Sequence, residues 1–175
     1  MIVAGLDVAS TTGVCIGEIG QIPEFHSKIL GARGSSHDSR FAEALKLARW
    51  LINDNGVEAV GIEAPIIVPR RDNKSTNELL MGMNANIRGW CYIKAVRCQS
   101  FEIAFIDKLF IGARQKGRAE RKAAIQHRCK MLGWSPKTDD EADAGSVFFV
   151  MCAEIDPDFA INNSPLFGTA RMKKT

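Results

Sequence analysis

The chain has 175 residues, of which 46% are hydrophobic and 25% charged, and its formal net charge is +3. These values are typical of one soluble globular domain that is long enough to bury a core. The most apolar run, residues 147–153, is far shorter than the roughly 20 residues that span a bilayer, so a membrane protein is not expected. No signal peptide opens the sequence, and five scattered cysteines favour reduced cytoplasmic thiols over a disulfide framework or a zinc site.

Opposite charges gather in two neighbouring segments. Lys108 to Lys130 holds eight basic residues and one acid, whereas Lys137 to Asp158 holds seven acids and one base. Two solvated faces that neutralise each other would explain this pattern without any function. The functional alternative is a polyanion-binding surface beside a cation-binding pocket.

The first part of the chain predicts three strands and a helix. Residues 1–8 form an apolar run closed by Asp7, which is typical of a strand buried on both faces. Further strands are expected over 13–19 and 25–30, with short connections that favour antiparallel hairpins. Apolar residues at helical spacing then predict a helix over 41–52, which an Asn-Gly pair ends.

The rest of the chain predicts strands that alternate with helices. We expect strands over 57–62 and 101–106, and helices over 75–98, 118–132 and 139–155. An irregular loop is expected over 65–74. The domain should cover 1–155, and 156–175 should form an irregular basic tail. Hairpins followed by alternation predict an α/β domain, with a mixed sheet covered on both faces and a ligand site at the strand ends.

Four acids stand where they would meet. Asp7 ends the first strand and Glu63 ends the fourth, so parallel neighbouring strands would bring both acids to one edge of the sheet. Asp140 and Asp143 share one face of the last helix. Converging carboxylates repel one another unless cations neutralise them, and oxygen ligands alone favour Mg²⁺ or Mn²⁺. The structural alternative for Asp7 is a turn or capping role. Thr138 and Glu141 have capping-box spacing, which explains Asp139 and Glu141 without function but does not explain Asp143.

Three segments together carry a resemblance. GLDVASTTGV, VGIEAPI and the DxxDA that opens the late helix resemble the motifs of the RuvC family of Holliday junction resolvases, within the RNase H-like superfamily. The resemblance covers roughly residues 1–153. It implies an RNase H-like fold, with a mixed five-stranded sheet of order 3-2-1-4-5, the first three strands antiparallel, and helices on both faces. Ile66 replaces an aromatic residue common in cellular members, so the chain looks more like divergent phage and prophage relatives.

The resemblance also implies an activity, namely a structure-selective endonuclease that resolves Holliday junctions or other branched DNA by two-metal phosphodiester hydrolysis. Asp7, Glu63, Asp140 and Asp143 match the family's metal-binding carboxylates, which would hold two Mg²⁺ ions per active site, with Mn²⁺ as a substitute. Arg121 or Lys122 would contact DNA near the cut. The full set of basic residues expected to bind DNA is Arg70, Arg71, Lys74, Arg114, Lys116, Arg118, Arg121 and Lys122.

A homodimer is implied as well, because a four-way junction has two strands of like polarity to cut. The candidate interface is the helix over 75–98, which carries a broad apolar stripe: Leu79, Leu80, Met83, Ile87, Trp90 and Cys91. A role in the domain's own core is the alternative for this stripe.

Two other functions stay open. One is a catalytically silent module that binds branched DNA. The other is a phosphate-transferring ATPase of the actin-like or sugar-kinase type, which also begins with an acid at the end of its first strand. Those ATPases enclose their nucleotide between two domains, and 175 residues supply one. Nicking of branched DNA with Mg²⁺, compared with ATP hydrolysis and metal-free binding, separates the three functions.

Overall fold

The computed structural model of the protein describes residues 1–67, 74–113 and 117–166. Its centre is one sheet of five strands in the order β3-β2-β1-β4-β5. The strands are β1 (Ile2–Asp7), β2 (Thr11–Glu18), β3 (Glu24–Ile29), β4 (Ala59–Glu63) and β5 (Arg97–Phe101). Neighbours within β1 to β3 run antiparallel, whereas β4 runs parallel to both β1 and β5. This order and these directions confirm the predicted sheet.

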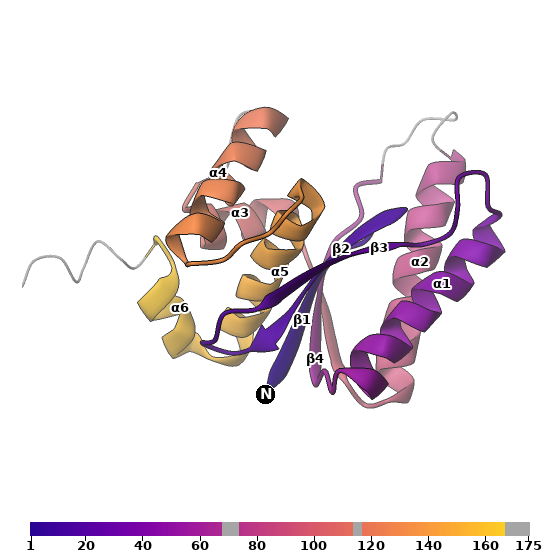
Figure 1. Cartoon of the computed structure of the whole chain (residues 1–175), viewed down its shortest axis with the longest axis horizontal. Coiled ribbons are helices and arrows are strands. Elements are labelled where there is room, and N and C mark those ends of the chain that lie inside the picture. Colours follow the sequence, from indigo (N-terminus) through magenta and orange to yellow (C-terminus); the bar gives the residue numbers. More distant parts are fainter. Residues whose placement is uncertain (68–73, 114–116, 167–175) are drawn as a thin grey trace, which may run out of the picture.

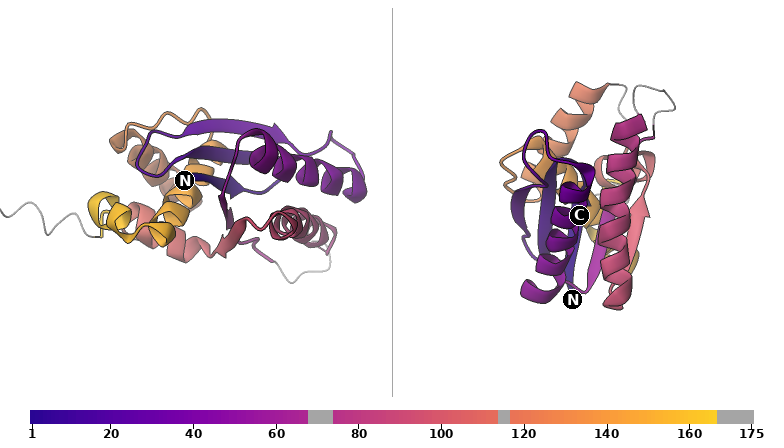
Figure 2. Two further views of the ribbon diagram at one scale, coloured as in Figure 1. Left: turned by 90° about the horizontal axis from the view of Figure 1, so that it is seen from below. Right: turned by 90° about the vertical axis from the view of Figure 1, so that its right-hand side faces the viewer.

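Helices cover both faces of the sheet (Figure 1). One face carries α1 (His37–Arg49), which continues into a π-helical turn (Trp50–Asp54), and α2 (Lys74–Ile93), which lies beside α1 (Figure 2). The other face carries α3 (Ile103–Ile111), α4 (Arg118–Met131), α5 (Asp139–Ile155) and α6 (Pro157–Asn163). No helix among these described residues is long and apolar enough to cross a membrane. All five cysteines are free thiols, as predicted.

Strand β1 lies between the two core clusters of the domain, because Val3 packs in the cluster with α5, and Ala4 and Leu6 pack in the cluster with α1 and α2. Val3, Ala4 and Leu6 of β1 are fully buried, as the unbroken apolar run predicts for a central strand. Residues 141–153 of α5 are all buried, because the sheet covers one side of this helix and the neighbouring helices cover the other. Gly5 has no side chain, and this lets the α5 backbone at Phe148 lie directly on β1.

The prediction for the segment after α2 is wrong in detail. The helix ends at Ile93 instead of residue 98, and Ala95 turns the chain with a positive φ of 54°. The fifth strand is 97–101, whereas most of the predicted strand 101–106 belongs to helix α3. A short apolar run suits a strand and a buried helix equally well, and this ambiguity explains the error.

The predicted irregular tail is also wrong in its first part. Pro157–Asn163 forms α6, and the Asp156 side chain caps this helix by accepting hydrogen bonds from the backbone N–H groups of Asp158 and Phe159. Phe159 packs on Phe149 of α5, with ring centroids 5.0 Å apart. The folded unit therefore continues past residue 155. The last part of the predicted tail, 167–175, lies outside the described residues.

The predicted interface stripe on α2 belongs to the core of the domain. Met83, Ile87 and Cys91 are fully buried, and Leu79, Leu80 and Trp90 pack against the same cluster. The sheet and α1 use this whole face, so the alternative reading of the stripe is the right one.

Gly5→Ala should separate α5 from the sheet. A Cβ atom at Gly5 would overlap the backbone nitrogen of Phe148 and the carbonyl oxygen of Ala144, neither of which can rotate away. We expect the free energy of unfolding to fall by about 3 kcal/mol. Gly89→Ala in α2 is the matched control, because its Cβ atom would meet nothing within 4 Å; it should gain roughly 0.5–1 kcal/mol. Denaturant unfolding measures both, and equal small effects would contradict the close packing.

Candidate functional site

The four predicted acids meet at one edge of the sheet. Asp7 and Glu63 are the last residues of β1 and β4, and these strands pair in parallel with Leu6 opposite Ile62. Asp140 and Asp143 lie in the first turns of α5. A Cβ atom at Gly13 of β2 would overlap the Asp140 carbonyl group, so a glycine is needed there for α5 to begin over this edge. The convergence that the sequence predicts is confirmed as geometry.

A cleft of about 1000 Å³ opens over this edge, between the β4 exit and helices α3 and α4. Six carboxylates and three basic side chains are among the described residues that line it. They are Asp7, Glu63, Glu102, Asp107, Asp140 and Asp143, with Arg118, Arg121 and Lys122. With every group ionised, these residues leave three negative charges without a matching positive charge. The cleft is therefore suited to a cationic ligand.

Arg121 lies inside this carboxylate cluster and holds three of its members. Its Nε donates to Asp107 at 2.8 Å, and its Nη1 donates to Asp143 at 2.8 Å. Its Nη2 donates to Glu63 at a longer 3.4 Å. The Arg121 side chain is only 16% exposed, so solvent screens these ion pairs weakly. The three carboxylates come from α3, α5 and the end of β4, and one side chain thus links three elements.

Burial and mutual repulsion shift the pKa values of the acids upward. Burial, with Asp143 and Asp140 nearby, raises the pKa of Asp7 to about 7. Burial and the Asp7 carboxylate raise the pKa of Glu63 to about 8, although Arg121 opposes the shift. Burial also raises the pKa of Asp143. One guanidinium therefore does not neutralise the cluster.

The donor set fits hard divalent cations, because every candidate ligand is a carboxylate oxygen and positive charge is in deficit. Within the described residues, no three Asp, Glu, His or Cys side chains are arranged around a single metal position. In this arrangement the Arg121 nitrogens contact oxygens of both Glu63 and Asp143.

The predicted DNA-binding residues are divided by the structure. Arg118 and Lys122 line the cleft on α4, and Lys122 pairs with Asp139 at 2.7 Å. Lys74 begins α2, pairs with Glu78 at 3.8 Å and is not among the residues that line the cleft. The predicted contacts that lie outside the described residues are Arg70, Arg71, Arg114 and Lys116.

Sequence reasoning missed Asp107, the most buried acid of the cluster at 2% exposure. It also missed Glu102, which precedes α3 and lines the cleft. A signal was present, because Asp107 shares the apolar face of its helix with Ile103, Ile106 and Phe110. A charge on a buried helix face requires a partner. The predicted strand over 101–106 ends one residue before Asp107, so the prediction does not recognise this helix face.

Glu141 has the structural role that its spacing predicts. Thr138 caps α5 by accepting a hydrogen bond from the backbone N–H of Glu141. The Glu141 carboxylate accepts one hydrogen bond from the backbone N–H of Lys137 and another from the Ser27 hydroxyl, at 2.6 and 2.8 Å. Glu141 thus ties the start of α5 to β3, away from the cleft.

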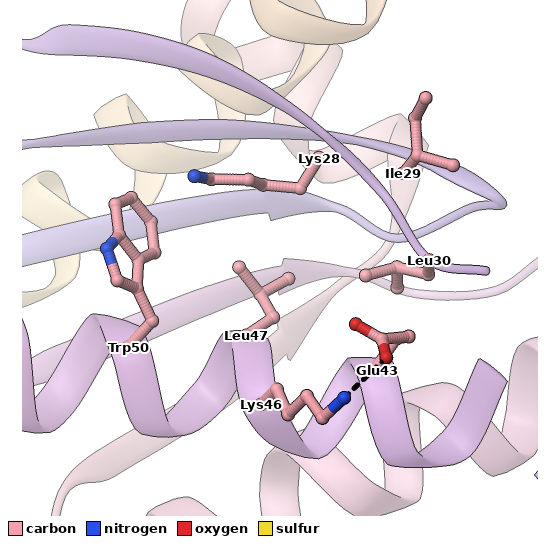
Figure 3. A pocket seen from close by; sticks show the side chains of 7 residues that line it. All are labelled: Lys28, Ile29, Leu30, Glu43, Lys46, Leu47 and Trp50. Atoms are coloured by element: carbon pink, nitrogen blue, oxygen red, sulfur yellow. Dashed lines mark hydrogen bonds and ion pairs between the residues drawn. The ribbon is translucent and has the colours of Figure 1, made fainter. Parts of the chain in front are cut away.

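A smaller cavity of about 190 Å³ lies between β3 and α1 (Figure 3). The Lys28 ammonium stands 4.0 Å from the centre of the Trp50 ring, and Lys46 pairs with Glu43 at 2.7 Å. These charges are satisfied by partners within the cavity wall. The acidic cleft is therefore the stronger candidate for a functional site.

No protein-family model matches the sequence, and no curated protein matches it either. Solved structures do match the fold. RuvC of Thermus thermophilus in complex with a Holliday junction substrate superimposes with a TM-score of 0.67 at 12% identity, over 89% of this chain and 96% of that one. The yeast mitochondrial Holliday junction resolvase Ydc2 gives 0.64 at 10% identity, over 91% and 83%. The fowlpox virus Holliday junction resolvase gives 0.57 at 10% identity, over 89% and 99%.

These matches define the class of fold. The chain has the fold of RuvC and other Holliday junction resolvases, and this confirms the fold that the resemblance implies.

Without divalent cations, the site should make stability depend on pH. Asp7 and Glu63 have raised pKa values of about 7 and about 8, above their ordinary values of 3.8 and 4.5. Between the ordinary and the raised pKa values, the folded chain therefore binds more protons than the unfolded chain. The stability that this proton binding contributes is lost as pH rises through about 7 and about 8. In the double variant Asp7→Asn with Glu63→Gln, the free energy of unfolding should fall less steeply as pH rises.

Denaturant unfolding in chelator, from about pH 5 to about pH 9, measures this effect. Glu78→Gln with Glu43→Gln, two acids on the far helices α1 and α2, is the control of equal charge change. An equally steep fall in the site variant and in this control would show that other groups cause it.

Proposed function

We propose that the protein is a metal-dependent endonuclease that cleaves branched DNA, with Holliday junctions among its substrates. The observation that carries the proposal is the convergence of Asp7, Glu63, Asp140 and Asp143 in one cleft, on the fold of RuvC and other resolvases. T. thermophilus RuvC and the fowlpox virus resolvase each have a structure with Holliday junction DNA, and this supports branched DNA as the partner.

In this proposal the four carboxylates hold two Mg²⁺ ions, or Mn²⁺ in their place. The bound ions would lower the pKa of an attacking water and stabilise the oxygen that leaves the phosphodiester. Burial of the carboxylates serves this purpose, because a site with few competing waters strengthens each electrostatic contact.

Basic residues at the rim would hold the DNA backbone. Arg118 is exposed at the start of α4, and Lys122 follows one turn later on the same side of the helix. Phosphate contacts of this kind position a strand without reading its sequence, as a structure-selective enzyme requires. The remaining proposed contacts, outside the cleft or outside the described residues, are Arg70, Arg71, Lys74, Arg114 and Lys116.

Asp7→Asn, Glu63→Gln and Asp143→Asn should each abolish cleavage and preserve DNA binding. Each change removes a cation ligand and also lowers the repulsion between the cleft and phosphate. The rate should fall by more than about a hundredfold, since even residues that only support a metal ligand contribute about 10–100-fold. Cleavage of four-way junctions, flaps and linear duplexes in Mg²⁺, with binding measured in chelator, gives both quantities.

Glu141→Ala is the matched control, an acid of the same helix that points away from the cleft. It should cost about 1–3 kcal/mol of unfolding free energy, because two hydrogen bonds to a buried carboxylate are lost. Turnover well below the unfolding temperature should stay unchanged. Comparable loss of cleavage in Glu141→Ala would undermine the assigned ligand set. Retained cleavage in the three ligand variants would refute the ligand set, whereas a wild type that binds branched DNA without cleaving it would favour the silent DNA-binding module.

We propose further that the nuclease is a homodimer through the exposed face of α2. The core uses the opposite face, yet Met81 and Tyr92 stay 56% and 87% exposed, with Ala85 between them. The spacing of four and seven residues places the three on one side of the helix. Two aligned cuts in a four-way junction require two such sites related by a two-fold axis.

Ala85→Arg should convert this dimer into a monomer. An arginine in the centre of a helix–helix contact brings bulk and an unpaired charge, whereas the exposed position leaves the fold intact. Sedimentation should give about twice 19.2 kDa for the wild type and 19.2 kDa for the variant. Ala123→Arg, at an exposed position of α4, is the control. A wild type that stays monomeric with junction DNA bound would refute the dimer.

A further inference from the structure

The most buried charged side chain in the described part of the chain, Asp107, forms an ion pair with Arg121. Asp107 is 2% exposed on α3, and the Nε of Arg121 on α4 donates to its Oδ1 at 2.8 Å. Unlike the four predicted acids, Asp107 lies neither at a strand end nor on α5. The site therefore contains a fifth buried carboxylate, which the proposed cation ligands leave unexplained.

The planar geometry of the Arg121 guanidinium indicates what the Asp107 carboxylate does. The N–H groups of arginine point in fixed directions within one plane. Once Asp107 holds Nε, the two Nη atoms can reach only a limited region. In the structure this region contains Asp143 on one side, at 2.8 Å, and Glu63 on the other, at 3.4 Å. Asp107 thus determines where the positive charge of Arg121 stands.

The proposed cations would lie in the same region between Glu63 and Asp143. Arg121 uses Oδ1 of Asp143 and Oε2 of Glu63, and a divalent cation between the two side chains would draw on the same two carboxylates. A guanidinium and a cation of like sign also repel each other at short range. The two cannot both occupy the centre of the cluster, so they compete.

We propose that Arg121 is a resident counter-charge that competes with the divalent cation for Glu63 and Asp143, and that Asp107 is the residue that positions it. The inference rests on the proposed cation binding. When a cation binds, the Nη atoms release both carboxylates while Nε stays on Asp107. The freed face of the guanidinium is then available to a DNA phosphate at the same cleft.

The test is a Mg²⁺ titration of thermal unfolding, without DNA. The variants are Arg121→Gln, Asp107→Asn, their combination, and Arg121→Lys, which keeps the charge and loses the planar fork. Lys46→Gln is the matched control, because it removes one positive charge and one ion pair on the opposite face of the sheet. The combined variant guards against misfolding, since it leaves no unpaired charge at the pair.

Arg121→Gln should reach half of its Mg²⁺-dependent stabilisation at about tenfold lower Mg²⁺ than the wild type, because the competing charge-assisted hydrogen bonds are gone. Arg121→Lys should show a smaller decrease. Asp107→Asn should also lower the midpoint, because Arg121 is no longer held in the cluster. In the Arg121→Gln background, Asp107→Asn should give no further decrease. Lys46→Gln should match the wild type.

Asp107 would act differently if it were itself a cation ligand. Asp107→Asn would then raise the Mg²⁺ midpoint in both backgrounds, and this result would overturn the inference. An unchanged midpoint in Arg121→Gln would overturn it too. Both results leave the proposed nuclease intact, because the wild type still responds to Mg²⁺. A wild type that Mg²⁺ does not stabilise at all would instead count against the cation site itself, and with it the proposed function.

Discussion

Repulsion between buried carboxylates is the constraint on which the rest of the site depends. Asp7, Glu63 and Asp143 each have a raised pKa, and burial is the first cause for all three. A globular chain avoids such a cluster unless something compensates it, because an unpaired buried charge costs several kcal/mol, on the order of its desolvation energy. Arg121 compensates part of the negative charge. The remaining deficit of positive charge is what makes the cleft suited to a cationic ligand.

The packing of α5 on β1 holds these charges together. Helix α5 is buried on all sides over 141–153 and rests on β1 at Gly5, so its first turns cannot retreat from Asp7. Glu141 and Ser27 fasten the same end of the helix to β3. The favourable free energy of burying the apolar core thereby opposes the repulsion between the carboxylates at the sheet edge. The packing of the core thus keeps mutually repelling charges together at the site.

The sequence predicted the structure correctly where a residue pattern is typical of only one structure. Unbroken apolar strands ended by Asp7 and Glu63, and the capped start of α5, predicted the meeting of the acids, whereas the sheet order was implied by the resemblance to the RuvC family. It failed where patterns are ambiguous, as in 101–106, where an apolar run suited a strand or a helix and most of the segment belongs to α3. The pair of Asp107 and Arg121 was lost with that helix, since the two residues meet only through the packing of α3 against α4.

The same packing separates two basic residues that are adjacent in sequence. Lys122 has an ammonium group, which acts as a compact point charge, and it pairs with Asp139 at the outer rim. Arg121 is turned inward, where only a planar fork with several donors can join carboxylates from three different elements. In the proposed function, the lysine would contact DNA at the rim of the cleft, whereas the arginine would balance charge within it. Sequence alone left these two residues interchangeable, because helical periodicity records the side of a helix and not the depth to which a side chain reaches.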